Sequence, residues 1–241
     1  MLIKQFPWED SLTAEDQTVI KKGGYGKERG LGKKPLLVIV DPQYNYVGED
    51  KPIVEQLDQW PSGGGREAWN AIRIIQKLKV AFKENELPVL YTKNVQKKTL
   101  KFDSFAVKAD RDNTKYLADA PETEIVKELT PDPEDLVLEK SYASAFYGTP
   151  LLSYLIKMQV DSLILVGGSS SGCIRALAVD AVTRNFNVAV VMDATYDRIQ
   201  LSHKATLLDL WMKYCDVVNS DQINNYLNEL KKEDYYVGLA D

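Results

Sequence analysis

The chain has few of the residues that build disulfide frameworks and structural metal sites. It contains two cysteines, Cys173 and Cys215, and one histidine, His203, in 241 residues. Two cysteines are too few for a disulfide framework, and a single histidine without a CxxC pair argues against structural zinc. The fold must therefore be stabilised by its hydrophobic core.

Long apolar runs and an excess of positive charge are also missing. No stretch approaches the ~18 consecutive apolar residues of a membrane span, and the first residues are charged where a secretory signal would be apolar. We therefore expect a soluble, cytoplasmic protein that has no membrane partner. The net charge of −5 argues against nucleic acid as the main partner, so the basic run from Lys93 to Lys101 is interpreted as solvated surface.

Short apolar runs alternate with helical patterns along most of the chain, and 44% of the residues are hydrophobic, which suffices for a full core. This alternation predicts one α/β domain in three layers, with a parallel sheet between two layers of helices. The expected strands are 36–40, 88–92, 136–138, 163–166, 188–192 and 216–218. The expected helices are 66–85, 150–158, 174–182, 202–214 and 221–232.

Three further segments carry expectations of their own. Residues 1–34 are polar and interrupted by glycine, which predicts an extended N-terminal arm lying on the body or on a neighbouring subunit, before the domain at 35–241. The segment from Val47 to Gly65 contains two prolines and three consecutive glycines, and long loops of this kind are either functional lids or ordinary surface insertions. The polar segment 93–130 is expected to contain one helix, near Glu122 to Glu128.

Three ionisable residues follow expected strands at their carboxyl ends, where open parallel sheets place their reactive sites. Asp41 follows the first strand, Lys140 the third and Cys173 the fourth. Cys173 begins a helix after the small residues "GGSSSG", and the positive end of a helix favours a thiolate. We expect Cys173 to attack an amide carbonyl, Asp41 to carry the proton, and Lys140 to act as a fixed positive charge.

The small residues before Cys173 let the main chain approach a substrate closely. Gly168 and Ser169, together with the backbone N–H of Cys173, form a candidate oxyanion hole. Each residue also has an ordinary structural interpretation: a small core residue for the cysteine, a turn cap for Asp41 and a surface lysine for Lys140. An alternative function for "GGSSSG" is to bind the phosphate of a nucleotide at a helix N-terminus. Cys215 is expected in the core, and His203 is expected to be structural.

Four sequence blocks, in order, resemble the isochorismatase-like cysteine hydrolases, and within them the branch of N-carbamoylsarcosine amidase. The blocks are "LLVIVDPQYNY", "LEKSYASAFYGTPL", "GGSSSGCIRALAVDAV" and "DATYDRIQLSHKATLLDLWMKYCDVV". The resemblance covers most of the chain, from about Lys33 to Val218. It departs from the family's usual pattern at Gly168, where a bulky aliphatic is common, at Tyr46, where phenylalanine is common, and in the length of the segment 47–65.

This resemblance implies a sheet order of 3-2-1-4-5-6, a catalytic triad of Asp41, Lys140 and Cys173, and a cis peptide bond at Gly168–Ser169. It further implies that Arg198 binds a substrate carboxylate, that no metal or other cofactor is needed, and that the protein is a homodimer or homotetramer. The implied activity is hydrolysis of a linear C–N bond in a small carbamoyl or amide substrate, with release of ammonia. Maleamate, ureidoacrylate and biuret-type amides are rival substrates, and a non-catalytic binding protein is the alternative of a different class.

Overall fold

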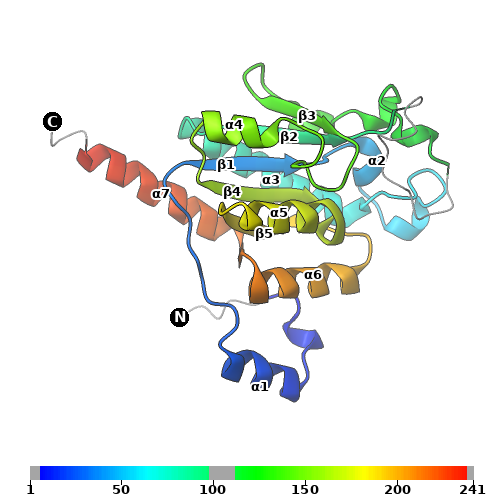
Figure 1. Cartoon of the computed structure of the whole chain (residues 1–241). Coiled ribbons are helices and arrows are strands. Elements are labelled where there is room, and N and C mark those ends of the chain that lie inside the picture. The colour runs from blue at the N-terminus through cyan, green and yellow to red at the C-terminus, as the bar shows by residue number, and fades with distance from the viewer. Residues whose placement is uncertain (1–5, 98–111, 238–241) are drawn as a thin grey trace.

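A six-stranded parallel sheet lies at the centre of the computed structural model, which describes residues 6–97 and 112–237 (Figure 1). Every neighbouring pair of strands is parallel, and the order β3-β2-β1-β4-β5-β6 confirms the expected topology. The strands are β1 (Pro35–Val40), β2 (Val89–Asn94), β3 (Leu136–Lys140), β4 (Ser162–Gly168), β5 (Asn187–Tyr196) and β6 (Asp216–Val218).

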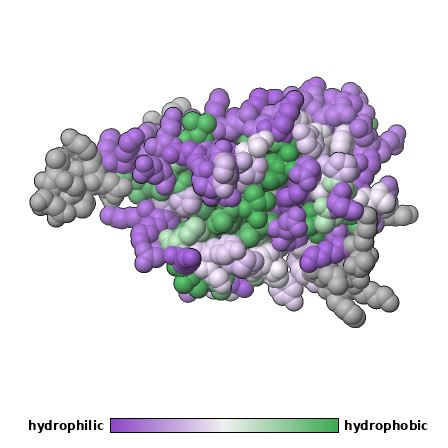
Figure 2. All heavy atoms as spheres, turned by 90° about the horizontal axis from the view of Figure 1, so that it is seen from above, coloured by the Kyte–Doolittle hydropathy of each residue, from purple (hydrophilic) through white to green (hydrophobic). Residues whose placement is uncertain are grey.

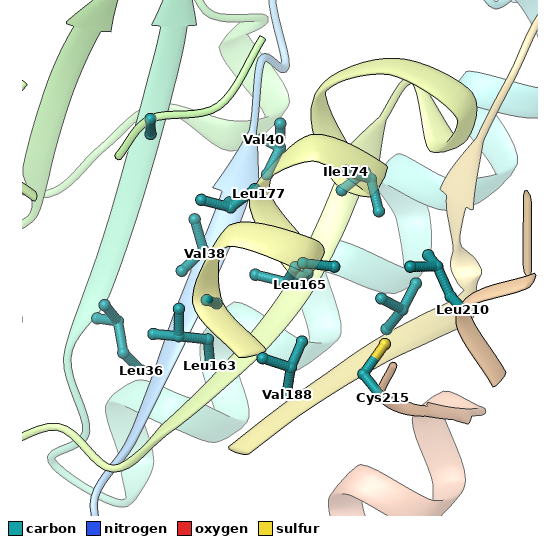
Figure 3. Packing of buried hydrophobic residues seen from close by; sticks show 14 of the residues in the cluster. Leu36, Val38, Val40, Leu163, Leu165, Ile174, Leu177, Val188, Leu210 and Cys215 are labelled. Atoms are coloured by element: carbon teal, nitrogen blue, oxygen red, sulfur yellow. The ribbon is translucent and has the colours of Figure 1, made fainter. Parts of the chain in front are cut away.

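Helices cover both faces of the sheet, as the alternating sequence pattern predicts. Successive side chains of β1 point to opposite faces, and all six of its residues are buried. The α-helices are α1 (Ala14–Gly23), α2 (Tyr44–Val47), α3 (Gly65–Glu84), α4 (Leu151–Lys157), α5 (Arg175–Thr183), α6 (Gln200–Lys213) and α7 (Ser220–Val237). Leu36, Val38 and Val40 pack in the cluster that includes residues of α4, α5 and α6 (Figure 3), whereas Leu37 and Ile39 pack in the cluster with α3 and α7.

The N-terminal arm is not simply extended, because it contains the helix α1. Thr13 and Asp16 form a capping box at its start, with Thr13 Oγ1 accepting from the Asp16 N–H at 3.1 Å and Asp16 Oδ2 accepting from the Thr13 N–H at 2.9 Å. Gly24 ends the helix in a left-handed conformation. The glycines that argued against a long element therefore begin at the last residue of a short helix, Gly23, and continue beyond it.

The arm lies against α6 and the β6 end of the sheet. Trp8 is only 2% exposed, and its ring centroid lies 5.7 Å from that of Trp211. The Lys204 ammonium lies 2.6 Å from an Asp10 carboxylate oxygen, and the Asp216 carboxylate accepts the N–H of Arg29 at 2.9 Å. In Figure 1 the arm accordingly descends below α6 before the chain rises into β1.

Two other expectations differ from the structure. The helix expected near Glu122 to Glu128 is wrong: two short 3₁₀ turns, Pro121–Thr123 and Lys127–Leu129, are separated by extended residues. Val126 explains this, because its buried side chain lies in the α3-side core while its N–H donates to the Pro42 carbonyl at 2.9 Å. β5 is also longer than expected, so Asp193 lies within the strand.

Smaller differences concern single termini. Asp193 accepts bonds from the N–H and hydroxyl of Ser220, at 2.9 and 2.6 Å, and so binds the start of α7. Pro150 is the N-cap of α4, and Thr149 accepts the Leu151 N–H at 3.1 Å.

Cys215 is buried in the core as expected. The basic run 93–101 is not solvated surface at its start, because Lys93 and Asn94 are buried residues at the end of β2. Residues 98–101 of this run lie outside the described residues.

The surface on the β3 side of the sheet carries a band of apolar atoms between polar surroundings (Figure 2). Exposed apolar residues of this region include Val137 on β3 and Leu152 and Ile156 on α4. None of the helices in the described part of the chain has the length and apolar character needed to span a membrane.

Candidate active site

Asp41, Lys140 and Cys173 meet at the carboxyl ends of the strands, as their positions in the sequence predict. Lys140 Nζ lies 2.8 Å from Asp41 Oδ2 and 3.3 Å from Cys173 Sγ. Asp41 and Lys140 are 1% and 3% exposed, and Cys173 is half-buried. Lys140 ends β3, two strands away from β1 in the sheet, so its long side chain reaches past β2 to join the other two groups.

Asp41 is held in place by Thr92 of β2, a residue that the sequence did not single out. Asp41 adopts a left-handed backbone conformation with φ of 49°. Its N–H donates to the carbonyl of Thr92 at 3.2 Å, and the Thr92 hydroxyl donates to Asp41 Oδ1 at 2.6 Å. One carboxylate oxygen is thus bound by Thr92, and the other by Lys140.

Gln43 and Asn94 form a second buried support that sequence reasoning missed. Gln43 Oε1 accepts the Asn94 N–H at 2.6 Å, and Gln43 Nε2 donates to the Asn94 carbonyl at 3.1 Å. The Asn94 side-chain amide then lies 3.7 Å from Cys173 Sγ. The only indication in the sequence was that polar residues follow the apolar start of β2.

The protonation states follow from burial and from the charges within the triad. Burial disfavours the charge on Lys140, but the Asp41 carboxylate and Cys173 outweigh burial and raise the Lys140 pKa above its ordinary value. Loss of solvent around the sulfur, and then the charge of Asp41, raise the pKa of the Cys173 thiol to about 11, although Lys140 opposes them. These contacts favour the protonated thiol, contrary to the expectation that the helix start favours a thiolate.

The turn between β4 and α5 presents Cys173. The peptide bond between Gly168 and Ser169 is cis, as the family resemblance implied. Residues Ser170–Ile174 form a π-helical turn before α5, so Cys173 precedes the first turn of the α-helix rather than lying in it. Gly167 has a φ of 100°, and a Cβ there would lie 2.3 Å from the Val40 carbonyl oxygen, so this close approach of β4 to β1 requires glycine.

His203 and Asp197 fix this turn to neighbouring elements. Ser170 Oγ donates to the Tyr196 carbonyl at 3.1 Å and lies 2.7 Å from His203 Nδ1, so the histidine donates to the serine from that nitrogen. Asp197 accepts from the N–H and the hydroxyl of Ser171 at 2.8 and 2.6 Å. His203 thus binds the turn that carries Cys173.

Arg198 lies at the edge of the segment 47–65 rather than against the triad. Its guanidinium donates to the Ser62 carbonyl at 3.0 Å and lines a cavity of about 700 Å³ with residues of that segment, among them Ile53 and Pro61. Within 6–97 and 112–237, no hydrogen bond or ion pair joins Arg198 to Asp41, Lys140 or Cys173.

The segment 47–65 is itself ordered around one buried side chain. Gln56 is 4% exposed, accepts the Glu49 N–H at 2.8 Å and donates to the Lys51 carbonyl at 2.8 Å. The Gly64 N–H donates to the Tyr46 carbonyl at 2.8 Å, which closes the loop against α2. These bonds give the segment a fixed conformation beside Arg198.

One group of three candidate metal ligands occurs in the described part of the chain, and it lies away from the triad. Asp132, Glu134 and Asp135 are close together at the start of β3. Lys79 lies 3.2 Å from Asp132, and Lys83 forms ion pairs with all three carboxylates. The lysine ammonium groups satisfy the charge of this cluster.

Comparison with known proteins matches residues 35–222 to the isochorismatase domain. The chain is 30% identical over 223 residues to the maleamate amidohydrolase of Pseudomonas putida, covering 92% of this chain and 98% of that protein. It is 26% identical over 217 residues to the N-carbamoylsarcosine amidase of an Arthrobacter species, covering 88% and 78%. The solved structure of N-carbamoylsarcosine amidase from Thermoplasma acidophilum is similar with a TM-score of 0.62 and 28% identity, covering 78% of this chain and 97% of that one.

Proposed function

Because this chain belongs to the isochorismatase family and is a hydrolase related to amidohydrolases, we propose that it cleaves a linear C–N bond of a small carbamoyl or amide substrate through a covalent bond to Cys173. The proposed substrate carries a carboxylate and resembles N-carbamoylsarcosine or maleamate. The observation that carries this proposal is the joint contact of the Lys140 ammonium with Asp41 and Cys173, at 2.8 and 3.3 Å.

In the first half of the reaction, Asp41 accepts the Cys173 thiol proton as the sulfur attacks the substrate carbonyl carbon. The raised pKa of this thiol requires such a base, and Asp41 contributes to that rise directly as charge and as hydrogen-bond partner. The Asp41 proton then passes to the leaving nitrogen. The C–N bond breaks, ammonia leaves, and a thioester or thiocarbamate remains on the sulfur.

In the second half, Asp41 takes a proton from water as the water oxygen attacks the same carbon. The C–S bond breaks, and the proton returns to the sulfur, so the acid product leaves and the thiol is restored. Lys140 stays positively charged, and this charge stabilises the Asp41 carboxylate and the Cys173 thiolate whenever either group is ionised. Backbone N–H groups of Gly168, Ser169 and Cys173 would stabilise the oxyanion that forms in each half.

Arg198 is proposed to bind the substrate carboxylate. A guanidinium matches a carboxylate with two parallel hydrogen bonds. Arg198 lies just after β5, and its contact with the Ser62 carbonyl holds the guanidinium against the segment 47–65. The carboxylate would then lie between this segment and the triad.

The test is ammonia release from maleamate, N-carbamoylsarcosine and ureidoacrylate by the wild type and by Cys173→Ala. The wild type is expected to hydrolyse at least one of these compounds, and Cys173→Ala is expected to lose the activity. Cys215→Ala is the matched control, because it removes the same atoms from the buried cysteine outside the site. Thermal melting checks that both variants are folded. Release of ammonia by folded Cys173→Ala at the wild-type rate would exclude the covalent mechanism.

A further inference from the structure

Tyr196 is the last residue of β5, and two glycines make room for its ring. It is 3% exposed and pairs in register with Gly168 of β4. A Cβ on Gly168 would lie 2.5 Å from both Cε2 and Cζ of Tyr196, and a Cβ on Gly64 would lie 2.6 Å from Cδ2. The ring therefore fills the slot between the carboxyl end of β4 and the N-terminus of α3.

The ring of Tyr196 lies against β4, the strand next to the one that ends at Asp41. The ring starts on β5, and its outer carbons, nearest the hydroxyl, lie against Gly168 of β4. The other neighbour of β4 in the sheet is β1, which ends at Asp41. The ring thus lies over the carboxyl end of β4 on the α3 side of the sheet, and the charge of Asp41 acts on its hydroxyl.

This hydroxyl is a buried donor that lacks a partner. Tyr196 Oη has no hydrogen-bond partner in the described part of the chain. Burial, and then the charge of Asp41, raise the pKa of Tyr196 well above its ordinary value, so the phenol keeps its proton and can donate. Buried polar groups in folded proteins are almost always paired, so an unpaired donor beside reactive groups indicates a position for a ligand oxygen.

We propose that Tyr196 is a substrate-binding residue whose hydroxyl donates a hydrogen bond to the substrate carboxylate. This inference rests on the proposed function, because it assumes that an acid amide is bound at Cys173. Arg198 follows Tyr196 by two residues, and its positive charge acts on the phenol, so both donors come from the end of β5 and the residues that follow it. A carboxylate has two oxygens, and a phenol and a guanidinium together can satisfy both.

Another tyrosine of the same chain supplies a matched control. Tyr91 Oη is also buried without a partner in the described residues, but its surroundings are the acidic cluster of Asp132 and Asp135. Lys79 Nζ lies 5.9 Å from its ring centroid. Tyr91→Phe and Tyr196→Phe therefore remove the same unpaired atom from two buried positions, one beside the acidic cluster and one at the proposed substrate.

The experiment measures kcat and KM for the amide that the wild type hydrolyses, in wild type, Tyr196→Phe and Tyr91→Phe. Tyr196→Phe is expected to raise KM by roughly ten- to a hundredfold with kcat nearly unchanged, the loss typical of one bond to a charged group. Tyr91→Phe is expected to leave both constants unchanged. Both variants should melt at or above the wild-type temperature, since each removes a buried unpaired donor.

Three results would overturn the proposal. If KM of Tyr196→Phe equals that of the wild type while hydrolysis still depends on Cys173, the proposed function stands and the role of Tyr196 is wrong. If kcat falls and KM does not, the hydroxyl serves the scissile carbonyl instead of the carboxylate. If the wild type hydrolyses none of maleamate, N-carbamoylsarcosine and ureidoacrylate, the proposed function fails, and the role of Tyr196 fails with it.

Discussion

The hydroxyl of Thr92 binds both the side chain and the backbone of Asp41. It donates to Asp41 Oδ1 at 2.6 Å, and its oxygen lies 3.1 Å from the Asp41 N–H. The register of β1 and β2 pairs Val40 with Thr92, so Asp41 leaves the sheet directly beside this threonine. A single β2 side chain thus orients the carboxylate and leaves its second oxygen for Lys140.

Removing this hydroxyl should weaken catalysis without changing the fold. Thr92→Val keeps the shape of the side chain, and a hydrogen bond to a charged group contributes about 1.5–3 kcal/mol. We expect kcat/KM for ammonia release to fall about ten- to a hundredfold. Thr92→Ser retains the hydroxyl and should keep most of the activity. Equal rates for the valine and serine variants would show that Asp41 is oriented without Thr92.

Asp41→Asn should separate thiol reactivity from hydrolysis. The negative charge of Asp41 helps raise the pKa of Cys173 to about 11, so its removal, with Lys140 still present, should lower that pKa. Alkylation of Cys173 by iodoacetamide at pH 8 should therefore become faster, because more of the thiol is ionised. Ammonia release should fall by about 10²–10⁴-fold, as expected when a general acid–base group is lost.

The rate of this alkylation is measured at a series of pH values by mass spectrometry of the peptide that contains Cys173. In the wild type the rate should rise with pH up to about 11. Cys215, which is buried in the core, reports unfolding and should stay unmodified in both proteins. Slower alkylation of Cys173 in Asp41→Asn than in the wild type would contradict the assigned effect of Asp41.

His203 should make the protein less stable in mild acid. Burial lowers the pKa of His203 below its ordinary value of 6.5. As the pH falls below about 6.5, His203 binds a proton in the unfolded chain while it is still neutral in the folded chain. The free energy of unfolding should therefore fall as the pH decreases. At higher pH this histidine is neutral in both states, and its contribution to stability no longer depends on pH.

The chain has a single histidine, so this effect can be assigned directly. Urea unfolding at pH 7.5 and 5.5 should show a larger loss of stability in the wild type than in His203→Gln. The imidazole proton resonance in the NMR spectrum gives the pKa of the folded state. A measured value at or above that of the unfolded chain would contradict the prediction.

The sheet, its order and the positions of the three triad residues could be predicted from the sequence and the family resemblance. Continuous apolar runs specify strands buried on both faces, and the residue that ends each run then lies at one edge of the sheet. Asp193 shows the limit of this rule. Polar residues follow the apolar part of β5 as well, but the strand continues past Asp193, whose carboxylate binds Ser220.

The supports of the site could not be predicted, because they depend on pairings between distant segments. Before the register of β2 with β1 is known, nothing distinguishes Thr92 from the other polar residues that follow the apolar run of β2. Likewise, the ring of Tyr196 finds its place only when Gly64 and Gly168, more than a hundred residues apart in sequence, are brought together. The protonated state of Cys173 also depends on such tertiary contacts, since burial and Asp41 determine it.

The contacts of the N-terminal arm have a consequence for synthesis of the chain. Asp10 and Lys204 are 194 residues apart, and at roughly 5–20 residues per second about 10 to 40 seconds of translation separate them. Until α6 emerges from the ribosome, Trp8 has no Trp211 against which to pack. The arm is thus synthesised before α6 and packs against it only once α6 has formed. Nascent chains that stall before α6 therefore expose Trp8 to chaperones and proteases.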